Sequence, residues 1–146
     1  MSRSSRSLLL ALTLGSLSMP LAACTQVEEF ESTYSSTTVE PIKGRDDDVQ
    51  RVTFTAEAAR RADLKTATVR PDGRRTSIPY DALIYDEEGA TFTYVSPEPL
   101  VFVREPIDVL RIGGSRVVLR DGPPAGTTVV TTGAPEVYSA EFGVEE

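Results

Sequence analysis

Few side chains in this chain of 146 residues could carry out nucleophilic, acid–base or redox chemistry. The sequence has no His and no Trp, a single Cys and two Met. Imidazole and thiolate groups supply many protein nucleophiles, general bases and ligands for soft metals. Their scarcity argues against an enzyme or a metal centre, so we predict no catalytic residue, no metal site and no cofactor.

Carboxylates are the main remaining candidates for chemistry. Asp81 and the acidic run 86–88 lie around one expected hairpin. A paired acid–base site needs its carboxylates on one concave face, and loop carboxylates are usually solvated, so a hydrolase is a weak alternative. The run Asp46–Asp48 lacks the alternating oxygen ligands and central Gly of a calcium loop, and it is better explained as solvated charge.

The one cysteine, Cys24, directly follows a segment with the features of an export signal. Arg3 and Arg6 form a basic start, residues 8–21 are apolar but short for a bilayer span, and Ala22-Ala23 precede the cysteine. This pattern resembles a bacterial lipobox, in which the cysteine becomes the first residue of the mature chain and carries acyl chains such as palmitate. An ordinary signal peptide with an incidental cysteine is the alternative. Because each buried methylene contributes about 0.8 kcal/mol, several acyl chains would hold the protein firmly on a membrane.

The chain divides into three predicted parts. Residues 1–23 are the lipoprotein signal peptide. Residues 24–50 are polar and rich in Ser, Thr and Asp, without a repeating apolar face, which predicts a lipidated Cys and a disordered tether. Residues 51–146 are long enough for one modest core. The formal net charge of −7 argues against a nucleic-acid partner.

Alternating β-branched and aromatic residues, with Gly- and Pro-rich turns between them, dominate residues 51–146. We predict a mainly β fold, a small antiparallel β-roll or barrel-like domain with one short helix. The helix is expected over 56–62 with Thr55 as its N-cap, and further helical turns over 135–142 should end at Gly143. The expected strands cover 51–55, 65–69, 91–95, 100–110, 116–120 and 127–132.

Aromatic and proline residues at two expected turns form a candidate binding surface. Proline-rich edges do not complete a hydrogen-bonded ladder, so they expose backbone and side chains together. Tyrosines of a small β domain more often pack its core, so binding and packing are competing interpretations here. The candidate residues are Tyr80, Tyr85, Pro97, Pro99 and Phe102.

Several stretches carry Pro, Gly and β-branched patterns that match a known family. They are 52–55 with 60–69, then 78–85, 102–109 and 124–134. These stretches resemble the two ends of periplasmic adaptor (membrane fusion protein) subunits of RND-type efflux pumps, which meet in a membrane-proximal β domain. Only residues 70–77 separate the two ends here, which leaves no room for the lipoyl-type, helical-hairpin and barrel domains of that family. The resemblance implies a membrane-proximal domain alone, in which residues 51–69 pair with strands of 78–133.

The resemblance also implies a function. It indicates a lipid-anchored accessory subunit of an efflux or export transporter that binds an RND-type permease, on the extracytoplasmic side of the cell membrane or outer membrane. A homo-oligomer is left open. The alternative is a stand-alone cell-envelope lipoprotein that binds a small ligand or an envelope component, which a deep apolar pocket would favour.

Overall fold

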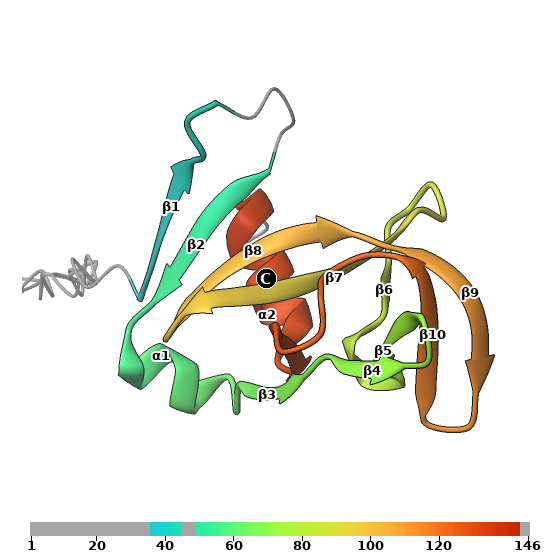
Figure 1. Ribbon diagram of the computed structural model, residues 1–146. Helices are drawn as coiled ribbons and strands as arrows, with labels where there is room; N and C mark the ends of the chain where they lie inside the picture. Colours follow the sequence, from blue (N-terminus) through green and yellow to red (C-terminus); the bar gives the residue numbers. More distant parts are fainter. Residues whose placement is uncertain (1–35, 45–48, 144–146) are drawn as a thin grey trace, which may run out of the picture. The chain divides into compact units, whose positions relative to one another are not determined.

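Strands dominate residues 36–44 and 49–143, which are the residues that the computed structural model describes (Figure 1). They form a seven-stranded and a four-stranded sheet, and the paired strands are antiparallel. The predicted mainly β, antiparallel fold with a short helix is confirmed. The predicted signal peptide, Cys24, the tether as far as residue 35 and the acidic run Asp46–Asp48 lie outside the described residues.

The larger sheet has the strand order β1-β2-β8-β7-β11-β3, and β6 pairs with β7. The smaller sheet has the order β4-β5-β10-β9. The strands of the larger sheet are β1 (Thr37–Pro41), β2 (Gln50–Phe54), β3 (Lys65–Thr68), β6 (Ile84–Tyr85), β7 (Thr91–Glu98), β8 (Val101–Pro106) and β11 (Thr128–Thr132). Those of the smaller sheet are β4 (Arg70–Asp72), β5 (Arg75–Pro79), β9 (Asp108–Gly113) and β10 (Arg116–Asp121).

The larger sheet begins earlier in the chain than the sequence analysis predicts. β1 lies within the predicted tether, and it pairs with β2 so that Val39 stands opposite Val52. The disordered-tether prediction is therefore wrong for Thr37–Pro41. The physical reason is that β1 is an edge strand, in which alternate side chains are only partly buried and the others are exposed. A mostly polar segment can therefore form this strand.

The expected pairing of the two chain ends is present. β2 pairs with β8, with Val52 opposite Phe102, and β3 pairs with β11, with Ala67 opposite Val129. Both pairs belong to the larger sheet. Residues 51–69 therefore share one sheet with strands of 78–133, as predicted.

Two short helices cover one side of the larger sheet. α1 (Ala56–Arg61) starts at Thr55, whose hydroxyl accepts a hydrogen bond from the Ala58 N–H at 3.1 Å. α2 (Ala134–Phe142) ends at Gly143, which has a positive φ of 65°. Both predicted caps are confirmed. The core beneath the helices contains the buried residues Val52, Phe54, Ala58, Ala59, Phe92, Tyr94, Phe102, Val130, Ala134 and Val137.

The predicted long strand over 100–110 is two strands in different sheets. β8 ends at Pro106, and β9 begins at Asp108 in the smaller sheet. Between them the Ile107 N–H donates to the Thr91 carbonyl at 3.0 Å, and the Ile107 side chain is buried. Pro106 thus marks a crossing between sheets. A second core lies at this junction and contains Val69, Ile78, Ala82, Ile107, Val117, Leu119 and Val129.

Candidate functional site

The predicted surface residues do not form a single surface. Tyr80, in the 3-10 helix η1 (Tyr80–Ala82), is 46% exposed, and Tyr85 in β6 is 53% exposed. Pro97 in β7 and Pro99 in the following turn are also exposed. Only the two prolines lie around the β7–β8 turn, so the tyrosines and the prolines are separate candidate sites.

The prediction that Phe102 belongs to a binding surface is wrong, because Phe102 is a core residue with 2% exposure. Its ring meets the Phe54 ring edge to face, with centroids 5.7 Å apart. β8 lies inside the larger sheet, so Phe102 points into the core beneath α1 and α2. The exposed part of the proline-rich turn therefore does not extend to Phe102.

A hollow of about 440 Å³ lies beside the β7–β8 turn. The turn holds Leu100 at a positive φ of 65°, which is uncommon for a residue with a branched side chain. The Leu100 carbonyl accepts a hydrogen bond from the Phe54 N–H at 2.9 Å, which fixes the turn against β2. The hollow is lined in part by Leu64, Thr66, Pro97, Pro99, Leu100 and Phe102.

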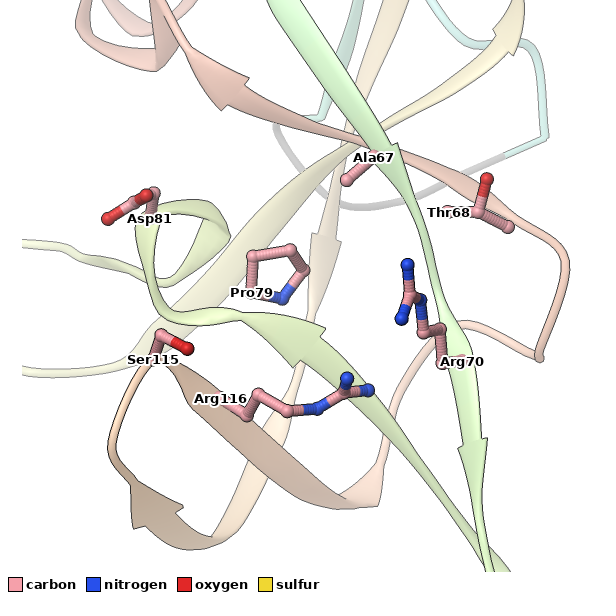
Figure 2. A pocket seen from close by; sticks show the side chains of 7 residues that line it. All are labelled: Ala67, Thr68, Arg70, Pro79, Asp81, Ser115 and Arg116. Atoms are coloured by element: carbon pink, nitrogen blue, oxygen red, sulfur yellow. The ribbon is translucent and has the colours of Figure 1, made fainter.

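A second hollow, of about 280 Å³, lies where β3 approaches the smaller sheet, and we call it the arginine hollow. Figure 2 shows the guanidinium groups of Arg70 and Arg116 on the same side of it, with Pro79 between them and Asp81. It is lined by Ala67, Thr68, Arg70, Pro79, Asp81, Ser115 and Arg116.

Strand register places the two arginines on one face of the smaller sheet. Arg70 on β4 stands opposite Ser77 on β5, and Arg116 on β10 stands opposite Pro79 on β5. Directly opposed residues share a face, and Ser77 and Pro79 are two residues apart on one strand, so all four side chains lie on the same side. The opposite side carries Ile78, which belongs to the buried junction core.

The two guanidinium groups differ in their bonding. Arg116 Nη2 donates a hydrogen bond to the Ser77 hydroxyl oxygen at 2.6 Å, and Ser77 is fully buried. Within the described residues, the structure gives the exposed Arg70 guanidinium no hydrogen bond and no ion pair. Arg116 is therefore oriented by the sheet, while Arg70 keeps its donors available.

The smaller sheet is basic in an acidic chain. Residues 70–79 and 108–121 contain six Arg and three Asp, whereas the whole chain has a formal charge of −7. Two of these aspartates are paired, Asp108 with Arg120 at 2.8 Å and Asp72 with Arg111 at 3.7 Å. The arginine hollow therefore lies in a region of positive charge.

Among the described residues, one carboxylate is fully buried, that of Glu141, and it does not line the arginine hollow. Glu141 of α2 accepts hydrogen bonds from the Tyr94 hydroxyl at 2.5 Å and from Arg104 Nε at 3.2 Å. Burial, and next the hydrogen bond to Glu141, raise the pKa of Tyr94 well above its ordinary value. The Arg104 guanidinium also stacks 5.1 Å from the Phe142 ring centroid. These groups are packed together, so they fasten α2 to the sheet and present no reacting surface.

The acidic residues of the predicted hairpin do not converge on a shared site. Asp86 closes its own loop, since its Oδ1 accepts from the N–H groups of Glu88 at 3.0 Å and Ala90 at 2.7 Å. Asp81 lies apart from them, on η1. Residues 36–44 and 49–143 contain no cluster of Asp, Glu, Cys or His suited to a metal ion. Neither helix there has the length and apolar character needed to cross a bilayer.

The arginine hollow is the feature that sequence analysis missed. Arg70 and Arg116 are far apart in the chain, and only the β4–β5 and β5–β10 pairings bring them together. The one available signal was the concentration of Arg in two β segments that have few Lys or Glu. Comparison of the chain with models of protein families, with curated proteins and with solved structures finds no significant match.

Proposed function

We propose that this chain is a lipid-anchored, adaptor-like accessory subunit of an efflux or export transporter, which acts by binding an RND-type permease. The observation that carries the proposal is the joining of the two chain ends in one sheet, β2 with β8 and β3 with β11. The resembling adaptors join their chain ends in the same way in the membrane-proximal domain. A module made of those ends alone is thus able to form the domain nearest the membrane.

The β7–β8 turn is the surface we assign to the permease. Pro97 and Pro99 are exposed with their φ angles fixed by the proline rings, and the Leu100 carbonyl is held against β2 by its hydrogen bond from the Phe54 N–H. A rigid surface loses little conformational entropy on binding, which favours docking through a small area. The lipid on Cys24 would then compensate for the small area by raising the local concentration of the module at the membrane.

A crosslinking experiment in membranes tests the proposal. A photoreactive residue is placed at Thr66, which is exposed and lines the hollow beside the turn, and at Thr38, which is exposed on β1, as the matched control. We expect a transporter permease to be captured from position 66 and not from position 38. Replacement of Cys24 by Ser should reduce the capture, although no contact residue changes.

Two outcomes count against the adaptor function. One is that no transporter is captured from either position. The other is that the Cys24→Ser protein remains in the membrane fraction as fully as the unchanged protein once its signal peptide has been removed, because the anchor would then be unnecessary. Capture from both positions alike would place the permease contact outside the β7–β8 turn.

The alternative function, a stand-alone lipoprotein that binds a small ligand, is favoured by a different observation. The arginine hollow brings two cationic side chains from separate strands to one concave place. Such a convergence of polar groups is typical of ligand sites. Recovery of a bound small anion, with no transporter in the pull-down, would favour this function over the adaptor.

A further inference from the structure

We propose that the arginine hollow binds the phosphate group of a small phosphate ester, whether the ester is dissolved or forms the headgroup of a lipid. The proposal does not depend on the transporter function. It rests on the positions of Arg70 and Arg116, on the hydroxyl groups around them, and on the positive charge of the smaller sheet.

Two guanidinium groups in one hollow match the geometry and charge of a phosphate. Each guanidinium presents a planar fork of N–H donors, and such forks bind phosphate oxygens in pairs. Figure 2 shows the Arg70 and Arg116 forks at the same end of the hollow. A phosphate monoester carries up to two negative charges, so it can satisfy both forks together.

The hollow is partly preorganised for this role. The buried Ser77 hydroxyl holds Arg116 at 2.6 Å, and it donates in turn to the Arg70 carbonyl at 3.5 Å, close to the limit of a hydrogen bond. Arg116 therefore loses little freedom when a ligand binds. The Ser115 hydroxyl on the lining, which Figure 2 shows directed toward the hollow, can add a donor for a remaining oxygen.

The opposite end of the hollow limits what the rest of the ligand can be. Asp81 lies there, with Pro79 between it and the arginines (Figure 2). Its carboxylate accepts hydrogen bonds, so it favours a ligand with hydroxyl or ammonium groups beyond the phosphate and disfavours a second anionic group. The volume of about 280 Å³ is at the small end of ligand sites, which suits a glycerol- or sugar-sized ester.

Binding measurements on the full chain, held in a phosphate-free maltoside detergent, test the proposal. Inorganic phosphate and glycerol phosphate are the dissolved probes, and phosphatidylglycerol or phosphatidic acid in the same micelles are the lipid probes. Arg70→Gln and Arg116→Gln should each weaken binding of the effective probe by about tenfold or more, the usual effect of losing a charge-assisted hydrogen bond. Arg70→Lys, which keeps the charge but loses the fork, should fall between Arg70→Gln and the unchanged protein.

Arg74→Gln is the matched control. Arg74 is exposed in the same hairpin and does not line the hollow, so its loss removes the same charge from the same sheet. It should change the affinity by less than about twofold, because exposed charges at a distance are screened. Amide resonances of Thr68 and Ser115 should shift on titration if the ligand occupies the hollow.

The results separate the sources of phosphate and can overturn the site. Binding of the dissolved probes alone assigns a soluble ester, and binding of the lipid probes assigns a headgroup; both support the shared chemistry. Equal weakening by Arg70→Gln and Arg74→Gln would mean a diffuse basic surface and would refute a built site. Absence of measurable binding by any probe at about 10 mM would refute it as well. Because Arg70 is exposed, Arg70→Gln is informative even if Arg116→Gln disturbs the sheet.

Discussion

At the scale of single residues, the buried carboxylate of Glu141 connects α2 to the larger sheet. It is fully buried, and it accepts from Tyr94 and Arg104 on two neighbouring strands. The Gln50 side-chain amide reaches the same residue and donates to its backbone carbonyl at 3.1 Å. A buried charge requires such partners, since transfer from water costs several kcal/mol when it is left unpaired.

Replacement of Glu141 by Gln should therefore lower the free energy of unfolding by about 3 kcal/mol, because Arg104 would lose its buried counter-charge. Urea unfolding followed by circular dichroism measures the change. Glu98→Gln is the control, since the Glu98–Arg51 pair is largely exposed, and it should cost less than about 1 kcal/mol. Equal costs for the two variants would mean that the buried network contributes no more than a surface pair.

Tyr94 gives a pH dependence with a definite sign. Burial and the hydrogen bond to Glu141 raise its pKa in the folded protein above the ordinary value of 10, so above that pH the unfolded chain releases a proton that the folded chain keeps. The free energy of unfolding should then fall by about 1.4 kcal/mol per pH unit from this one residue. The slope between pH 10.5 and 11.5 should be smaller by that amount in Tyr94→Phe. Identical slopes in the two proteins would contradict the raised pKa.

At the scale of elements, the sequence predicts those features that depend on a few neighbouring residues. Thr55 and Gly143 were predicted as caps because capping depends on a few neighbouring residues, and both predictions are confirmed. β1 was missed because a five-residue edge strand needs few apolar side chains. The crossing at Pro106 is not predictable from the sequence, since nothing near it specifies the sheet that β9 joins.

The candidate sites likewise are predictable where they depend on neighbouring residues and not where they depend on distant ones. Pro97 and Pro99 were predicted to be exposed because proline disrupts a ladder at its own position, and they are. Phe102 was misplaced because its burial depends on β2 and the helices, which are distant in the chain. Arg70 and Arg116 meet only through two strand pairings, so their proximity is a property of the assembled sheet.

The junction between β11 and α2 depends on Gly133. Its φ is +80°, and a Cβ there would collide with the Leu64 side chain and lie 2.9 Å from the Ala62 carbonyl oxygen. Gly133→Ala should cost about 3 kcal/mol of unfolding free energy, from the left-handed backbone and from overpacking against the α1–β3 turn. Gly143→Ala, which also has a positive φ but has no atom near the added Cβ, should cost only about 1 kcal/mol. Thermal or urea unfolding compares them, and equal costs would rule out the packing contribution.

At the scale of the whole molecule, the two sheets are interleaved along the chain. Within the described residues the backbone passes from one sheet to the other four times, between β3 and β4, β5 and β6, β8 and β9, and β10 and β11. The junction core contains Val129 from the larger sheet together with Ile78 and Val117 from the smaller one. Neither sheet can open without exposing apolar side chains of the other, so we expect both to unfold as one cooperative unit.

Native-state hydrogen exchange tests this cooperativity through Val117→Ala. The substitution removes buried methyl groups from the junction core and should cost about 2 kcal/mol, which would speed exchange of globally protected amides by about thirtyfold. In a cooperative unit the slow amides of β2, in the larger sheet, should accelerate as much as those of β10, where the mutation lies. Val52→Ala, in the core beneath the helices, should produce the reciprocal effect on β10. If Val117→Ala accelerates exchange only in the smaller sheet, that sheet opens independently, and the arginine hollow at its edge would open with it.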